Sequence, residues 1–325
     1  MSRIVVTEPI HADGLALLRG EGAQEVIAFD PPATPKQMRA AMPGAAAVLV
    51  RTIPLGADLL SLAPDLVIVS KHGVGCDNID LAHCAARGVP VTICAGANAN
   101  AVAEHTLMLM LACARRLTAQ DAAARAGDWG FRQRTGAFEL RGRTVLVVGM
   151  GRVGRLVAAL CAGFGMRVLG HGGRAWVEGV EYVDDLGEAL AQADIVTLHV
   201  PLTDATTGLI DAARLARMKP GAVLVNTARG GVADEPALID ALESGHLAML
   251  GTDVFAAEPV RADDPLLRLP CVIATPHTGA MTGESARAMA VQSARNVLDC
   301  LAGRLDPTAI HDTAPQSASQ GGTTP

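Results

Sequence analysis

The sequence predicts an α/β fold with two domains, each built on a doubly wound parallel sheet. Three observations lead to this prediction. Short apolar and β-branched runs alternate with helical patterns along most of the chain, the order that produces parallel strands. One such run, at 144–148, continues directly into a glycine-rich turn and a helical segment. The length of 325 residues suits two domains of ordinary size.

The first 99 residues form one small α/β unit. We expect strands at 3–7, 26–29, 47–50 and 67–69, with a helix at 12–19. The segment 70–80, Ser-Lys-His-Gly-Val-Gly-Cys-Asp-Asn-Ile-Asp, begins where the last of these strands ends. Gly73 and Gly75 could expose consecutive amides to an anion. On local grounds alone, an ordinary turn into a helix at 81–87 is the favoured interpretation.

A long apolar helix is predicted at 99–116. Its apolar residues cover more than one face, which indicates burial between domains or between subunits. We expect Glu104 and His105 on this helix to form a satisfied buried polar pair rather than a catalytic one. A segment rich in Arg and Gly, 127–142, then leads to the next strand.

The glycine motif Gly149-Met150-Gly151-Arg152-Val153-Gly154 follows the strand at 144–148 and precedes a helix. A helix N-terminus presents unpaired N–H donors and partial positive charge, which suit a pyrophosphate. Gly149 allows the tight turn, Gly151 lets the backbone approach the phosphates, and Gly154 lets the helix pack on the strand. A glycine-rich turn without a ligand is the alternative, and the flanking strand and helix favour nucleotide binding.

Further strands are predicted at 167–170, 195–199, 222–226, 249–253 and 272–274. With the strand at 144–148 they make six, the number in two mononucleotide-binding halves. A last helix at 284–302 is expected to return and pack on the first domain. The small polar tail 312–325 has nothing to bury, and we expect it to be disordered.

Composition excludes several classes of function. A net charge of −6 with dispersed basic residues argues against a nucleic-acid partner. No apolar run approaches the roughly 20 residues of a membrane helix, and the first residues do not resemble a signal peptide. The seven cysteines contain no C-x-x-C pair and the nine histidines no metal-ligand spacing, so no metal is expected. We expect a cytoplasmic protein without a membrane partner.

Three ionisable residues, Arg229, Glu258 and His277, each stand just past a predicted strand of the second domain. They can therefore converge at the carboxyl ends of neighbouring strands. Hydride delivery to a ketone leaves charge on oxygen, which a positioned histidine can protonate near neutral pH while a carboxylate favours its charged form. A guanidinium can bind a substrate carboxylate through two hydrogen bonds and polarise the carbonyl. For each residue alone, a surface ion pair or a turn is the alternative.

At this point the chain resembles the D-isomer-specific 2-hydroxyacid dehydrogenases, the group containing phosphoglycerate dehydrogenase and glyoxylate/hydroxypyruvate reductase. The resemblance covers residues 5–300 and depends on seven segments in the family's order: HGVGCDNID, ANAVAEHT, VVGMGRVG, HVPLT, NTARGG, DVFAAEP and TPHTG. It implies two Rossmann-like domains, with the cofactor domain inserted into the substrate domain. The expected bounds are 1–99 and 281–311 for the substrate-binding (catalytic) domain, 100–280 for the dinucleotide-binding domain and 312–325 for the tail.

The resemblance also implies the reaction and the roles of individual residues. The chain is expected to be an NAD(P)-dependent oxidoreductase acting on a small 2-oxo or (R)-2-hydroxy acid. Arg229 would bind the substrate carboxylate and carbonyl, and His277, partnered by Glu258, would be the acid/base. The amides of Val74 and Gly75 would bind the carboxylate, which reverses the local interpretation of that loop. We expect the dinucleotide to contact Gly149, Gly151, Arg152, Val153, Gly154, His171, Gly172, Gly173, Arg174, His199, Pro201, Thr227, Ala228, Asp253 and His277, with Asp253 facing the nicotinamide carboxamide.

Departures from the family pattern concern the substrate and the cofactor. Lys71 stands where the family often has Arg; with His72 it could meet a second anionic group, or it could simply fix the loop. An acidic residue that would accept the ribose 2′-OH is absent after the strand at 167–170, where the chain has Gly172. Gly172 and Gly173 leave room and Arg174 offers a phosphate fork, so NADP is favoured over NAD. An NAD enzyme with a solvated Arg174 is the alternative.

Two further departures, Ile93 and Ala95 where the family has Asn and Pro, have no interpretation. The segment after the last predicted helix is too short for a regulatory domain, so none is expected. A homodimer formed through the 99–116 helix is expected, and burial of that helix within one chain is the alternative. The rival to an enzyme is a dinucleotide-sensing binding protein of the corepressor type without significant turnover.

Overall fold

The structure is a computed structural model, and it describes residues 2–20, 24–173 and 177–311. The chain divides into two compact units, Met1–Asn98 with Gly283–Pro325, and Ala99–Thr282. Each unit contains one sheet in which every pair of neighbouring strands is parallel. The predicted α/β class is confirmed. The tail predicted to be disordered, 312–325, lies outside the described residues.

The sheet of the first unit has five strands in the order β2-β1-β3-β4-β5. Sequence analysis predicts four of these strands and misses the two-residue strand β5 at the edge. The elements of this unit are β1 (Ser2–Val6), α1 (Ala12–Gly20), β2 (Gln24–Ala28), α2 (Pro35–Ala41), β3 (Ala45–Val50), α3 (Ala57–Leu60), β4 (Ile68–Lys71), α4 (Leu81–Ala86), β5 (Val91–Thr92), α11 (Gly283–Leu301) and η4 (Pro307–Ala309).

Both faces of this sheet are covered. Alternate residues of β1 point to opposite cores, with Val5 in one and Ile4 and Val6 in the other. The core around Val5 includes Met38 and Leu60 from the helices α2 and α3, whereas the other is closed by α1 and α11, which pack on each other. The last long helix of the chain therefore completes the first unit.

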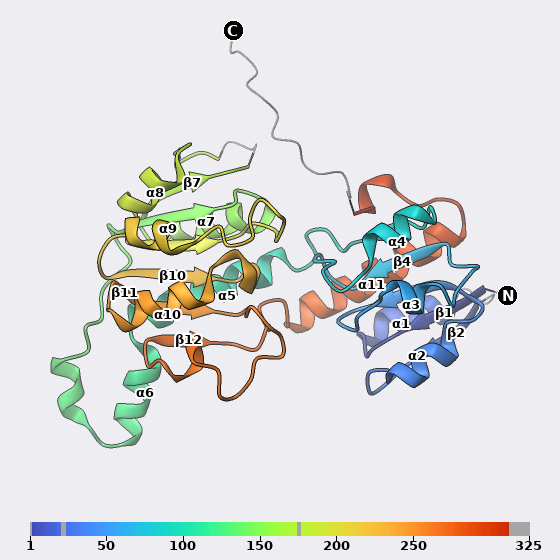
Figure 1. The fold of residues 1–325 in the computed structure, drawn as a ribbon, viewed down its shortest axis with the longest axis horizontal. Helices are drawn as coiled ribbons and strands as arrows, with labels where there is room; N and C mark the ends of the chain where they lie inside the picture. Colours follow the sequence, from blue (N-terminus) through green and yellow to red (C-terminus); the bar gives the residue numbers. More distant parts are fainter. Residues whose placement is uncertain (1, 21–23, 174–176, 312–325) are drawn as a thin grey trace, which may run out of the picture. The chain divides into compact units, whose positions relative to one another are not determined.

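The second unit has seven strands in the order β12-β11-β10-β9-β6-β7-β8, of which β7, β10, β11 and β12 are labelled in Figure 1. The strand order reverses beside β6, so the carboxyl ends of β6 and β9 form a topological switch point, where such sheets bind ligands. Its elements are α5 (Ala99–Ala114), α6 (Leu117–Arg125), η1 (Trp129–Gln133), β6 (Thr144–Val148), α7 (Arg152–Gly163), β7 (Arg167–His171), β8 (Val180–Tyr182), α8 (Leu186–Gln192), β9 (Ile195–Leu198), α9 (Ala212–Arg217), β10 (Ala222–Asn226), η2 (Gly230–Val232), α10 (Glu235–Glu243), β11 (Leu247–Thr252), η3 (Leu266–Arg268) and β12 (Val272–Ala274).

Helices also cover both faces of this sheet. α5 and α7 pack on one core, and α8, α9 and α10 on the other, with Val145 and Val147 of β6 facing the first and Leu146 and Val148 the second. Each of α8, α9 and α10 begins after an aspartate whose carboxylate accepts a backbone N–H of the first turn, a capping contact worth about 1 kcal/mol. These local signals explain why the chain alternates between strand and helix.

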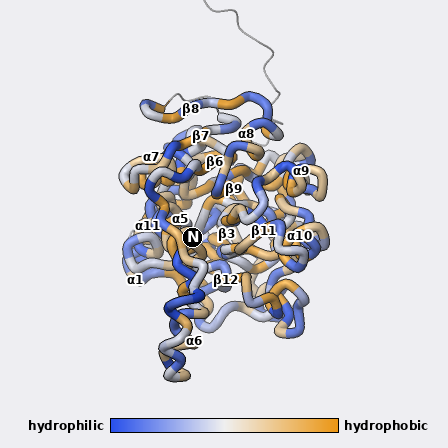
Figure 2. The backbone as a smooth tube through the Cα atoms, turned by 90° about the vertical axis from the view of Figure 1, so that its left-hand side faces the viewer, coloured by the Kyte–Doolittle hydropathy of each residue, from blue (hydrophilic) through white to orange (hydrophobic). Residues whose placement is uncertain are grey.

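Two expectations for this unit need correction. The sheet has seven strands rather than six, because the short edge strand β8 pairs with β7. The predicted helix at 99–116 ends at Ala114, and a separate helix α6 follows a left-handed residue, Arg116. α6 has no buried residue and projects from the sheet in both Figures 1 and 2.

No helix among the described residues is long and apolar enough to cross a membrane.

Candidate functional site

The glycine turn after β6 has the close contacts that exclude side chains. Gly149 has φ +99°, and a Cβ there would lie 2.6 Å from the carbonyl carbon of His199. A Cβ at Gly154 would lie 2.1 Å from the carbonyl oxygen of Gly149, so α7 packs directly against the turn. A Cβ at Gly151, the residue before α7, would meet nothing within 4 Å. The turn is therefore closed towards the protein at Gly149 and Gly154 and open to a ligand at Gly151.

The end of β7 lies beside this turn. The N–H groups of Gly149 and Met150 donate to the carbonyl oxygens of His171 and Gly172, at 2.8 and 3.2 Å. Gly172 faces open space, but a Cβ at Gly173 would lie 3.0 Å from Met150 Cβ. Gly173 therefore leaves no extra room, contrary to expectation. Arg174, predicted to contact a 2′-phosphate, lies outside the described residues.

Further predicted cofactor contacts follow β9 and β10, and of these His199 lies against Gly149 of the turn. His199 follows β9, and its ring shares a hydrogen bond of 2.9 Å with Thr197 Oγ1. Burial lowers the pKa of His199 to about 3, so its imidazole is neutral at physiological pH. Pro201 is exposed just beyond it. Thr227 follows β10, and its hydroxyl shares a hydrogen bond of 2.8 Å with Thr106 of α5.

Arg229 lies in a loop that packs tightly on the loop after β11. A Cβ at the next residue, Gly230, would lie only 1.9 Å from the carbonyl carbon of Phe255. Arg229 is half-buried, and its Nη1 donates to the Ala228 carbonyl oxygen at 2.7 Å. The Arg229 carbonyl oxygen accepts from Asn226 Nδ2 at 3.0 Å. The close contact at Gly230 brings the loop of Arg229 against the loop that leads to Glu258.

Glu258 and His277 are directly hydrogen-bonded. Glu258 Oε2 lies 2.6 Å from His277 Nδ1, and Glu258 Oε1 accepts the Phe255 N–H at 3.1 Å. Burial raises the pKa of Glu258, but the hydrogen bonds from His277 and Phe255 and the charges of His277 and Arg229 outweigh it, so this pKa lies below its usual value. An ionised carboxylate only accepts hydrogen bonds, which places a proton on Nδ1 and directs Nε2 away from Glu258. The His277 side chain is 48% exposed, so that nitrogen can reach a small molecule.

Asp253 lies at the end of β11 and is only 2% exposed. Its Oδ1 accepts from Thr275 Oγ1 at 2.6 Å and from the Thr278 N–H at 2.8 Å, and its Oδ2 accepts the Gly279 N–H at 2.8 Å. Thr275 Oγ1 also lies 2.8 Å from His105 Nε2. Sequence analysis misses these contacts, and the expected Glu104–His105 pair is wrong, because Glu104 is exposed and His105 bonds to Thr275.

In the first unit, Lys71 and His72 are buried at the end of β4, whereas Val74 is 38% exposed. Lys71 Nζ donates to the Arg51 carbonyl and to Asn78 Oδ1, both at 2.5 Å, as expected if this lysine fixes its own loop. Burial and the charge of Arg51 lower the pKa of His72 to about 4. His72 is thus neutral at physiological pH and adds no charge for a second anionic group. Gly75 is half-buried beyond Val74.

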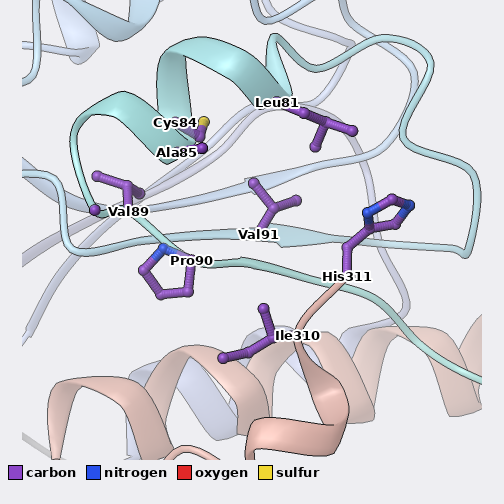
Figure 3. Close-up of a pocket in the computed structure, with 9 residues that line it drawn as sticks. Leu81, Cys84, Ala85, Val89, Pro90, Val91, Ile310 and His311 are labelled. Carbon is purple, nitrogen blue, oxygen red and sulfur yellow. The ribbon is translucent and has the colours of Figure 1, made fainter. Parts of the chain in front are cut away.

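The pocket in Figure 3 belongs to a different part of the first unit. Its lining is mostly apolar, from α4, β5 and the segment after α11, and includes Leu81, Val89, Val91 and Ile310. None of the predicted site residues contributes to it. Within the described part of the chain, no group of three or more His, Cys, Asp or Glu residues is arranged to bind a metal ion.

Comparison with known proteins adds independent information. Residues 107–279 match the model of the D-isomer specific 2-hydroxyacid dehydrogenase, NAD binding domain. The chain is 44% identical over 283 residues to D-3-phosphoglycerate dehydrogenase of Mycobacterium leprae (strain TN), covering 85% of this chain and 53% of that protein. It is 38% identical over 323 residues to glyoxylate reductase of Aeropyrum pernix, covering 95% and 96% of the two chains.

A solved structure agrees with these matches. The crystal structure of a protein from Thermus thermophilus superimposes with a TM-score of 0.86 at 36% identity, covering 94% of this chain and 98% of that one. The chain spans about half the length of the phosphoglycerate dehydrogenases it matches, from 53% to 60%, and nearly the whole of the Aeropyrum pernix protein.

Proposed function

The chain belongs to the D-isomer specific 2-hydroxyacid dehydrogenase family, and we propose that it is an oxidoreductase that transfers a hydride between a nicotinamide dinucleotide and a small 2-oxo or (R)-2-hydroxy acid. Its residues 107–279 correspond to the NAD-binding domain of that family. The observation that carries the proposal is the 2.6 Å contact between Glu258 and His277, which lie after β11 and β12, neighbours in the sheet of that domain.

The glycine turn fits the dinucleotide. Its open position at Gly151 lies at the N-terminus of the 12-residue helix α7, where free N–H groups would bind the pyrophosphate. We assign dinucleotide binding to the unit Ala99–Thr282 and the substrate-binding role to the other unit. When bound, the nicotinamide supplies the hydride for reduction and accepts it for oxidation.

His277 would act as the general acid in reduction. Glu258 orients the ring through Nδ1, so Nε2 is the nitrogen that delivers a proton to the substrate oxygen while the hydride reaches carbon. The guanidinium of Arg229 would bind the substrate carboxylate and polarise the carbonyl. In oxidation the same imidazole removes the hydroxyl proton, and Glu258 stabilises the imidazolium that forms.

The substrate is a small monoanionic 2-oxo acid, such as glyoxylate or hydroxypyruvate, in preference to a phosphoglycerate-like acid. The contacts of the Lys71 ammonium with the Arg51 carbonyl and with Asn78, and the neutral state of His72, support this choice. The amides of Val74 and Gly75 remain our candidate for binding the substrate carboxylate. For the cofactor we favour NADPH, because Gly172 faces open space and no acidic side chain follows β7 before Arg174.

The test is turnover of NADPH and NADH with a panel containing glyoxylate, hydroxypyruvate, pyruvate and phosphohydroxypyruvate. We expect the first two acids to be reduced. Tight dinucleotide binding without turnover of any acid would instead identify a dinucleotide-sensing binding protein of the corepressor type.

His277→Ala tests the acid/base role. It should lower kcat by about 10²–10⁴-fold, because the substrate oxygen loses its proton donor, while the dinucleotide Kd stays nearly unchanged. Steady-state kinetics and fluorescence titration with NADPH measure the two quantities. A kcat close to that of the wild type would remove His277 from the mechanism.

We also propose a homodimer formed through α5, α6 and η1. α5 itself packs within the second unit, but Met108, Leu117 and Trp129 are exposed by 44%, 55% and 77%, an apolar set that a second copy would cover. Light scattering should give about twice the chain mass of 33.4 kDa at micromolar concentration. A mass equal to that of one chain would reject the dimer.

A further inference from the structure

His277 lies in a strained turn. Its backbone has φ +53°, in the left-handed region that is unfavourable for a residue with a Cβ. Such a conformation persists only where surrounding contacts enforce it. The hydrogen bond that His277 Nδ1 donates to Glu258 fixes the ring and does not involve the backbone. Other groups must therefore hold the backbone of His277, which sets the position of its Cα and Cβ.

The Asp253 carboxylate contacts this turn on both sides of His277. Before it, Thr275 Oγ1 donates to Oδ1 at 2.6 Å; after it, the Thr278 and Gly279 amides donate to Oδ1 and Oδ2, both at 2.8 Å. A Cβ at Gly279 would lie 2.9 Å from Oδ2, so the turn approaches the carboxylate as closely as a glycine allows. One buried group thus spans the residues that flank His277.

The hydroxyl of Thr275 connects this carboxylate to α5. A hydroxyl has one proton to donate, and here it goes to Asp253 Oδ1, so Thr275 Oγ1 accepts from His105 Nε2 at 2.8 Å. His105 therefore donates to Thr275, which donates to Asp253, and His105 Nε2 also lies 3.4 Å from Asp253 Oδ1. We call these three residues the Asp253 network.

We propose that the Asp253 network positions the His277 turn, with Thr275 and His105 as positioning residues that act through the Asp253 carboxylate. This inference rests on the proposed function of His277. Asp253 is expected to face the nicotinamide carboxamide, and the network gives it a second role. Among the contacts named above, Oδ2 accepts only the Gly279 N–H, so it can accept a further hydrogen bond from the cofactor. A single carboxylate would then contact both the cofactor and the turn that presents the acid.

Thr275→Val tests the proposal, because it keeps the shape of the side chain and removes the hydroxyl. We expect kcat to fall by about tenfold, the loss of one hydrogen bond to a charged group, while the dinucleotide Kd and the KM of the acid change little. Thr275→Ser restores the hydroxyl and should recover most of kcat. Thr278→Val is the matched control, because Thr278 serves the network only through its amide, and it should retain wild-type kinetics.

A second measurement is independent of turnover. In protein labelled with ¹³C-histidine, the Cε1–H resonance of His277, assigned by its loss in His277→Ala, reports the surroundings of the ring. It should move in Thr275→Val and return in Thr275→Ser. If the wild type reduces no acid, the proposed function fails, while this resonance still decides whether the network positions His277.

Two results would overturn the proposal. One is a Thr275→Val protein with wild-type kcat and an unmoved resonance, and the other is a Thr275→Ser protein as slow as Thr275→Val. Should Thr275→Val fail to fold, His105→Phe removes the contacts of the His105 ring with Thr275 Oγ1 and with Asp253 Oδ1 and should lower kcat about threefold. Wild-type kcat and an unmoved resonance in that variant would equally reject the network.

Discussion

Gly230→Ala is the sharpest test of how the candidate site is assembled. Gly230 follows Arg229, and its Cα faces the backbone of the loop that leads to Glu258. A Cβ at this position would lie 1.9 Å from the carbonyl carbon of Phe255, 2.1 Å from its oxygen and 2.4 Å from the Ala256 nitrogen. All three atoms are backbone, so no side-chain rotation relieves the contact.

The magnitude follows from these distances. Ordinary contact begins at 3.4 Å, so the two loops must part by about 1.5 Å to admit the methyl group. A misplacement of about 1 Å costs on the order of 100-fold in rate, and we expect at least that loss in kcat/KM. Overpacking costs about 1–3 kcal/mol of stability, which lowers Tm by several degrees without preventing folding.

Gly231→Ala is the matched control one residue later. Its Cβ would lie 3.3 Å from Cδ1 of Leu202, the end of a side chain that is 37% exposed and can move. Kinetics of NADPH oxidation with the best acid of the panel, together with thermal unfolding and NADPH titration, separate catalysis from folding. The reasoning is refuted if Gly230→Ala keeps wild-type kcat/KM, or if the control loses as much.

Two further predictions concern cofactor choice and acid stability. The wild-type protein should have a higher kcat/KM with NADPH than with NADH. The Gly172→Asp, Arg174→Ala double variant should reverse this preference, because the new carboxylate repels a 2′-phosphate and accepts a hydrogen bond from the 2′-OH. A wild-type preference for NADH would contradict the prediction. The Glu8 carboxylate accepts the backbone N–H groups of residues 51, 52 and 53 at 3.0, 2.6 and 3.1 Å. Burial raises the pKa of Glu8, but these hydrogen bonds and the one from the Thr52 hydroxyl outweigh it, so the pKa lies below 4.5. Because the folded-state pKa is depressed, the stabilisation is complete above pH 4.5 and is lost as pH falls through the folded value. Urea unfolding of Glu8→Gln should therefore show a deficit of about 1.5–3 kcal/mol at pH 7 that shrinks in acid, and a gap independent of pH would be the contrary result.

Local patterns in the sequence predict most of the architecture. Strand and helix alternate because apolar runs end at caps and glycines, and this order alone produces parallel sheets with helices on both faces. The glycine motif is equally local, since its strand, turn and helix are contiguous. The positions of Arg229, Glu258 and His277 just past predicted strands suffice to place them at one edge of a sheet. Short strands escape this reasoning, and β5 and β8 are missed because two or three residues are too few to show a period of alternating apolar and polar side chains.

Tertiary structure decides what depends on residues far apart in the chain. The sequence shows a histidine on an apolar helix, but only folding brings His105 to Thr275, which lies 170 residues later. It leaves open whether Lys71 meets a second anionic group or fixes its loop, whereas folding brings its ammonium to the Arg51 carbonyl and to Asn78. It shows two glycines after β7, of which packing against Met150 leaves only Gly172 open. A local pattern determines what a residue can do, and its neighbours in space determine which of its hydrogen bonds and which of its charges remain available to a ligand.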